Sequence, residues 1–144
     1  MTTLPRVDSE DLTAYFDDAT SIAQVIYRGP MTASLTIRAY QWIAQITGVI
    51  GVEAIHGAVF DFRAVTNFES YTLSTVMRES KKANMKFDFS HVPVALLVGS
   101  GLQEQMVRVA LKVSPQDFRK RLVRSQEEAL AFIDEWHGQN APSG

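Results

Sequence analysis

Residues Gly57 to Leu73 read GAVFDFRAVTNFESYTL and contain the sharpest change of pattern in the chain. The run from Ala58 to Phe62 combines β-branched and aromatic residues around one acid, Asp61, and predicts a buried strand. The polar residues that follow break this pattern. Thr66 and Glu69, three positions apart, fit a capping box, in which two side chains satisfy free N–H groups at a helix start. The stretch therefore predicts a strand, a polar turn and a helix N-terminus, a place where α/β proteins commonly bind ligands.

Six residues of this stretch follow a spacing found elsewhere, without a gap: Asp61, Phe62, Val65, Glu69, Ser70 and Leu73. This spacing resembles the segment D-L-x-x-V-x-x-x-D-S-S-G-L of STAS domains, the fold of anti-sigma-factor antagonists. The chain departs from the end of that pattern, where the family's Asp is Glu69 and its Ser-Gly is Tyr71-Thr72.

Residues 122 to 133, reading LVRSQEEALAFI, extend the likeness. They resemble the ending of the small SpoIIAA-like branch of the family, which has a strand, a polar cap and an amphipathic helix. The resemblance implies an α/β fold with a mixed sheet of about five strands and helices mainly on one face. It also implies a protein partner, for which a kinase or an anti-sigma-type regulator is the candidate.

The rest of the chain fits this plan. Two strand-like runs separated by an acidic turn predict a β-hairpin that ends at Gly29-Pro30. Apolar residues at helical spacing then predict a helix from Thr32 with Gly48 as its C-cap, and residues 49 to 55 fit either a continued helix or an extended connection. The two strand-like runs are Leu12–Phe16 and Ile22–Tyr27. The apolar residues at helical spacing are Leu35, Ala39, Trp42, Ile43 and Ile46.

The second half predicts two more strands and three helices. A helix from Leu73 should place Glu79 towards solvent, and the nearly continuous apolar run Val92–Val98 predicts a strand covered on both faces. Gly99-Ser100-Gly101 opens the next helix, and Arg121–Arg124 predicts a short edge strand. Ser125 and Glu128 form a capping box for the last helix. The helix after the glycine turn should carry apolar residues on one side, namely Leu102, Met106, Val109, Ala110 and Val113. The expected buried stripe of the last helix is Ala129, Phe132, Ile133 and Trp136.

Bulk properties restrict the classes of function. The 144 residues predict a single domain over 1–137 and a flexible tail over 138–144. A net charge of −2 gives no basic excess for nucleic acid, and the chain has no cysteine for disulfides or thiolate chemistry. No apolar run reaches the roughly 20 residues of a membrane span, and the N-terminus lacks a secretory pattern. We therefore expect a cytoplasmic protein with neither nucleic-acid nor membrane partners.

Chemical motifs are weak. The three histidines, His56, His91 and His137, lack the spacing of metal ligands, so we expect neither a metal nor another cofactor. Asp61, Ser70 and His91 supply the residue types of a hydrolase triad, but no Gly-x-Ser-x-Gly motif surrounds the serine. The sequence thus predicts no catalytic residue and a protein that is not an enzyme.

Two hypotheses of function remain. The first is a regulatory, protein-binding module that contacts its partner through residues 66–72, with Thr66, Glu69, Ser70 and Thr72 together with Asp61 as candidate residues. Ser70 is either a phosphoacceptor at a helix start or a structural residue, because both roles suit a serine there.

The second is a carrier or sensor of a small apolar molecule, with a pocket lined by Phe60, Phe62 and Phe89. In either case, the apolar surface of the hairpin and of the helices with Trp42 and Trp136 predicts a homodimer.

Overall fold

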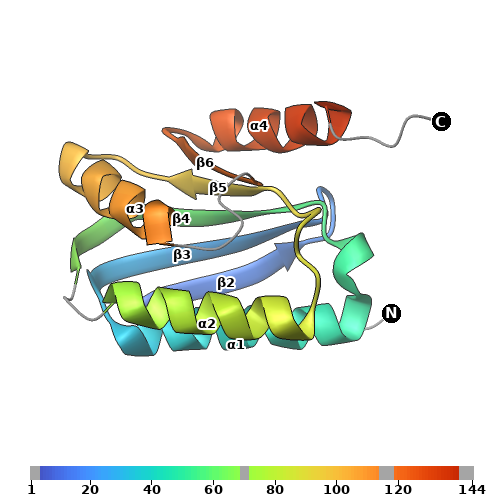
Figure 1. The fold of residues 1–144 in the computed structure, drawn as a ribbon, viewed down its shortest axis with the longest axis horizontal. Coiled ribbons are helices and arrows are strands. Elements are labelled where there is room, and N and C mark those ends of the chain that lie inside the picture. Colours follow the sequence, from blue (N-terminus) through green and yellow to red (C-terminus); the bar gives the residue numbers. More distant parts are fainter. Residues whose placement is uncertain (1–3, 69–71, 114–118, 140–144) are drawn as a thin grey trace.

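A computed structural model describes residues 4–68, 72–113 and 119–139. Its elements follow one another as β1 (Val7–Asp8), β2 (Leu12–Asp17), β3 (Ile22–Met31), α1 (Ala33–Ile50), a 3₁₀ turn (Val52–Ala54), β4 (Gly57–Phe68), α2 (Thr72–Lys86), β5 (Val94–Leu97), α3 (Gly101–Val113), β6 (Lys120–Val123) and α4 (Gln126–Gln139). The strands form one six-stranded sheet whose spatial order equals their order in the chain (Figure 1).

The sheet is mixed, as predicted. Strands β1, β2 and β3 pair antiparallel, whereas β3, β4, β5 and β6 pair parallel. Ala58 of β4 lies opposite Val94 of β5, so the two apolar runs expected to pair do so. Parallel strands must be covered on both faces, which explains why β4 and β5 alternate so little between apolar and polar residues.

The two faces carry separate cores. On one face α1 and α2 run side by side, and α4 covers the opposite face (Figure 1). Helix α3 contacts α2, β4 and β6. Val59, Ala95 and Ile133 belong to the core under α4, whereas Phe60 and Trp42 belong to the core under α1. Most helices therefore cover one face, as the sequence predicts.

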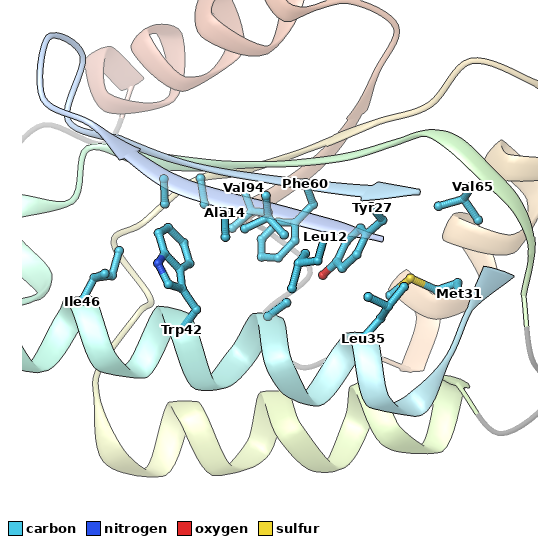
Figure 2. Packing of buried hydrophobic residues seen from close by; sticks show 14 residues of the cluster. Leu12, Ala14, Tyr27, Met31, Leu35, Trp42, Ile46, Phe60, Val65 and Val94 are labelled. Atoms are coloured by element: carbon cyan, nitrogen blue, oxygen red, sulfur yellow. The ribbon is translucent and has the colours of Figure 1, made fainter. Parts of the chain in front are cut away.

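Trp42 anchors the core under α1, where it points towards the sheet (Figure 2). Its side chain is 2% exposed, and its indole Nε1 donates a hydrogen bond to the Pro5 carbonyl at 2.8 Å. Trp136 is 9% exposed in the core under α4. Because both tryptophans are buried, neither supplies the exposed apolar surface on which the predicted homodimer rests, and the dimer stays a prediction.

Helix α1 starts where the sequence predicts but ends later. Thr32 is its N-cap, with Oγ1 accepting a hydrogen bond from the Leu35 N–H. The C-cap is Gly51 rather than Gly48, with a positive φ of 84° that glycine tolerates. The Gly51 N–H closes the helix by donating to the Thr47 carbonyl. The ambiguous stretch after Gly48 therefore continues the helix for two residues.

The first four strands differ from the expectation in three ways. The two-residue strand β1 adds a sixth strand to the expected five. Strand β3 continues through Gly29-Pro30 to Met31, because β4 is long enough to pair with it up to Phe68. The capping box of Thr66 and Glu69 is wrong, since Thr66 lies inside β4 and α2 begins only at Thr72. The β-branched and aromatic residues Val65, Thr66 and Phe68 favour this longer strand.

The C-terminal part agrees with the sequence. The Ser125 Oγ accepts from the Glu128 N–H at 3.1 Å, and a Glu128 carboxylate oxygen accepts from the Arg124 N–H at 2.6 Å. This is the reciprocal pattern of a capping box, except that Glu128 accepts from the N–H of Arg124 rather than from that of the N-cap residue Ser125. Helix α4 then continues to Gln139, so the boundary expected at 137/138 falls inside a helix.

Candidate functional site: an apolar cavity between the sheet and its helices

A cavity of about 120 Å³ lies between the sheet and the helices of the α1–α2 face. Strands β3, β4 and β5 form its floor, and α1, α2 and α3 contribute walls. The apolar lining consists of Ala23, Tyr27, Met31, Ile43, Ile46, Ile55, Ala58, Phe60, Phe62, Val76, Ala83, Phe89, Val92, Val94, Leu96 and Val107. A partly open, concave space with mostly apolar walls is the usual form of a small-molecule site.

The cavity brings together the three phenylalanines expected in an apolar pocket. Phe60 and Phe62 come from β4, and Phe89 comes from the connection between α2 and β5. Phe60 and Phe89 are 8% and 7% exposed, and Phe62 is half-buried. The Tyr27 ring lies 5.1 Å from the Phe62 ring and 6.3 Å from the Phe60 ring, measured between centroids. These contacts hold the floor of the cavity as one aromatic layer.

Small side chains account for the open space. Ala23 of β3, Ala58 of β4 and Ala83 of α2 all border the cavity. An unfilled volume lowers stability by about 24 cal/mol per Å³, or roughly 3 kcal/mol for a cavity of this size. Larger residues at these three positions would recover part of that free energy.

Polar groups enter the lining from α1, α2 and the start of β6. The Tyr40 hydroxyl and Ser80 Oγ are hydrogen-bonded at 2.7 Å. Arg119 is 7% exposed, and its Nη1 donates to the Val92 carbonyl at 3.0 Å. Burial lowers the pKa of Arg119 to about 10, which keeps the guanidinium charged at neutral pH. Burial also raises the pKa of Tyr40, so the phenol stays neutral.

Asp61 lies outside the cavity lining and has a structural role in β4. One carboxylate oxygen accepts from the Arg63 backbone N–H at 2.9 Å, and the other accepts from Arg63 Nη2 at 2.9 Å. These bonds sit where the β3–β4 register shifts, between the pairs Ile26–Asp61 and Arg28–Ala64. Two residues of β4, Phe62 and Arg63, there lie opposite the single β3 residue Tyr27, so the Asp61–Arg63 bonds stabilise a β-bulge.

The other candidate residues cluster at the far end of β4. Thr66 and Asn67 are exposed, Phe68 is half-buried and Val65 is buried. Thr72 is the first residue of α2. Glu69 and Ser70 lie outside the described residues, so the structure does not place the candidate phosphoacceptor.

Gln103 connects the end of β4 to the start of α3. Strand β5 ends at Leu97, opposite Asp61, so β4 continues beyond its neighbour. There the Gln103 Nε2 donates to the carbonyls of Arg63 at 3.1 Å and Val65 at 2.8 Å. Its Oε1 accepts from the Gly99 N–H at 2.8 Å. This side chain therefore occupies the Gly99-Ser100-Gly101 turn at the start of α3.

The described residues offer no other strong site. No group of three or more histidine, aspartate or glutamate side chains there is arranged to hold a metal ion. His56 and His137 stack with their ring centroids 4.2 Å apart. His56 Nε2 is bonded to Asp134 and His137 Nε2 to the His56 carbonyl, which ties α4 to the start of β4. None of the helices among the described residues has the length and apolar character that crossing a bilayer requires.

Comparisons with known proteins support the fold. No family model and no curated protein matches the chain. Among solved structures, an uncharacterized protein of the DUF3478 family with a SpoIIAA-like fold, from Shewanella loihica PV-4, matches with a TM-score of 0.61 and 14% identity. That match covers 92% of this chain and 98% of the other.

Two anti-sigma-factor antagonists also match. One, from Mycobacterium paratuberculosis, has a TM-score of 0.53 and 15% identity over 89% of this chain and 99% of its own. The other is SpoIIAA in its unphosphorylated form, with a TM-score of 0.52 and 12% identity over 88% and 96%. The chain has a SpoIIAA-like fold, as its sequence predicts. Identities this low concern the fold alone.

Proposed function

We propose that this chain is a non-enzymatic ligand-binding domain that takes a small apolar molecule into the cavity between the sheet and its helices. The observation that carries the proposal is the cavity itself, with about 120 Å³ of space bordered by Phe60, Phe62 and Phe89. Apolar cavities of about 150 Å³ in other proteins stay dry and bind benzene. The ligand is therefore about as large as one aromatic ring or a short branched alkyl group.

The energetics favour a ligand over a simple packing defect. Three alanines border the space, and each could be replaced by a larger apolar residue that would fill it. A bound molecule would contribute the dispersion contacts and apolar burial that the empty cavity lacks. The domain would therefore be more stable with its ligand, as expected for a carrier or a sensor.

Filling the cavity should raise stability and abolish binding. Ala58→Leu adds three carbons next to the open space, and we expect the free energy of unfolding to rise by about 0.5–2 kcal/mol. Toluene, titrated into the wild-type protein and followed by NMR chemical shifts of cavity methyl groups, should bind to the wild type and not to Ala58→Leu.

Ala95→Leu is the matched control. Ala95 is 0% exposed beneath α4 on the opposite face, away from the cavity. The same three carbons should overpack that core and lower the free energy of unfolding by about 1–3 kcal/mol. Toluene binding should survive in this variant under conditions where it is folded. A wild-type protein that gives no toluene-dependent shifts would overturn the proposal.

A second function is favoured by the exposed end of β4. Thr66 and Asn67 project from a strand end held by the Gln103 bonds, and the fold is shared with two anti-sigma-factor antagonists. Under this proposal residues 66–72 contact a protein partner, such as a kinase or an anti-sigma-type regulator, and Ser70 accepts a phosphoryl group. A regulator could use both surfaces, because α2 begins at Thr72, within this segment, and also walls the cavity.

A bulky charge at this end should weaken partner capture. We expect Thr66→Arg to reduce capture from a lysate of the source cells at least tenfold, since about 1.4 kcal/mol of lost contact suffices. Thr20→Arg is the control, because Thr20 is equally exposed but lies in the β2–β3 turn. Ser70→Asp should reduce capture where Ser70→Ala does not. Equal capture by all four variants would contradict the role of residues 66–72.

A further inference from the structure

We infer that the cavity takes a small aromatic or branched molecule with one hydrogen-bonding oxygen, as in a phenol, and that this oxygen pairs with the hydroxyl group of Tyr27. This inference rests on the proposed binding of an apolar ligand and adds the chemical class of that ligand. The observation that carries it is a buried hydroxyl group in the cavity lining that forms no hydrogen bond with any of the described residues.

Tyr27 extends from β3 into the layer between the sheet and α1. Figure 2 shows its ring leaving the sheet, with the hydroxyl oxygen in the space between the sheet and that helix. The residue is 2% exposed and borders the cavity. Its ring contacts the rings of Phe60 and Phe62. The position of the hydroxyl oxygen is therefore fixed by the packing of the ring.

The Tyr27 hydroxyl differs from the other hydroxyl groups of the lining, which have partners. The Tyr40 hydroxyl and Ser80 Oγ are hydrogen-bonded at 2.7 Å, and Thr36 Oγ1 donates to the Thr32 carbonyl at 3.2 Å. Among the residues that the structure describes, none donates to the Tyr27 hydroxyl or accepts from it. A tyrosine hydroxyl that is buried usually has a hydrogen-bond partner, so its absence here needs a physical reason.

The free energy of this hydroxyl favours a ligand that completes its bonding. Burying a hydroxyl group away from water without a partner destabilises the folded protein. Phenylalanine would place the same ring at this position without that penalty. A ligand oxygen that enters the cavity and forms the missing bond removes the penalty, so tyrosine is the better residue only in the ligand-bound protein.

At neutral pH the Tyr27 hydroxyl is a donor. Burial raises the pKa of Tyr27 well above its ordinary value, and the nearby phenol group of Tyr40 acts in the same direction. The hydroxyl therefore keeps its proton and donates to a ligand oxygen, while its own oxygen can also accept. A phenol or a small alcohol matches both capacities, and a carbonyl compound matches the first. A hydrocarbon such as toluene matches neither.

The test compares phenol with toluene on the intact protein by NMR titration at neutral pH. The two probes share one ring and differ only in a hydroxyl or a methyl group, and phenol, like a tyrosine side chain, is un-ionised under these conditions. Phenol should bind at least as tightly as toluene. A cavity with no partner for the hydroxyl should instead favour toluene by about tenfold or more, because burying an unpaired hydroxyl is unfavourable.

Tyr27→Phe removes the hydroxyl and keeps the ring. We expect the affinity for phenol to fall by about tenfold or more, while the affinity for toluene stays within about threefold. Without ligand, the urea midpoint of this variant should equal or exceed that of the wild type, because the hydroxyl has no partner among the described residues. Tyr15→Phe is the matched control, since it makes the same change on β2, outside the cavity lining, and should bind both probes as the wild type does.

Toluene binding to the wild type with phenol weaker by about tenfold or more would overturn this inference and leave the proposed function intact. Failure of both probes to bind would overturn both. An unchanged phenol affinity in Tyr27→Phe, or an equal loss of phenol and toluene, would overturn the inference because the hydroxyl would not pair with the ligand. A clearly lower midpoint for Tyr27→Phe would mean that the hydroxyl has a partner within the folded chain, and the inference would fail in the same way.

Discussion

Replacing Trp42 by alanine is expected to lower the free energy of unfolding by about 3–5 kcal/mol, the range for removing a large buried aromatic side chain. The indole is 2% exposed between α1 and the sheet, and its N–H bond to the Pro5 carbonyl ties the N-terminal segment to the helix. The substitution removes both the packing and this bond. Urea unfolding followed by far-ultraviolet circular dichroism would measure the loss.

Trp42→Phe separates the two contributions. Phenylalanine keeps much of the apolar volume but cannot donate to the Pro5 carbonyl, so we expect a clearly smaller loss than for alanine. A loss below about 1 kcal/mol for Trp42→Ala would contradict the placement of this residue at the centre of the core.

Gln103→Glu replaces one amide nitrogen of the α3 side chain that bonds the end of β4, and we expect it to lower the stability of the protein strongly. A carboxylate can still accept from the Gly99 N–H, but it cannot donate to the carbonyls of Arg63 and Val65. It also places a buried negative charge beside those two oxygens. Each lost bond to a buried acceptor costs about 1–3 kcal/mol, so we expect a total loss of roughly 2–5 kcal/mol in neutral buffer.

The pH dependence of that loss provides a second test. In the Gln103→Glu variant a protonated carboxyl regains one donor, so the loss should be smaller in mildly acidic buffer than in neutral buffer. Gln105→Glu makes the same change two residues further along α3, where the side chain is exposed, and should alter the free energy of unfolding by less than about 0.5 kcal/mol. Similar effects at both positions would contradict the bridging role of Gln103.

Local pattern was sufficient to predict the order of the strands and α-helices from β2 onwards. The apolar run at Val92–Val98 and the capping box at Ser125 predict β5 and the start of α4, because each depends only on residues close in sequence. The end of β4 was not predictable in the same way. Thr66 with Glu69 has the pattern of a helix start, but pairing with a long β3 keeps Thr66 in the strand. Long-range pairing decided that boundary.

The candidate site was predictable only in its aromatic part. Phe60, Phe62 and Phe89 carry a local signal, whereas Arg119 occurs in a stretch rich in basic residues that reads as surface. Its burial depends on the fold. In the same way α3 buries Gln103 and Val107 and exposes Leu102 and Val109, so the apolar side predicted from the sequence is not the buried side at Leu102 and Val109. Glu79 was expected in solvent and is buried beside two cations.

The agreement between strand order and chain order has a consequence for synthesis on the ribosome. Each strand joins an edge formed by the strand before it, so the sheet can grow in the direction of translation without waiting for distant segments. Its two faces are covered at different times. Helix α1 emerges early, but Val59, Ala95 and Leu97 have no cover until α4 arrives with Phe132, Ile133 and Trp136. During that interval the nascent chain exposes a flat apolar surface, which is the state in which chaperones would be needed.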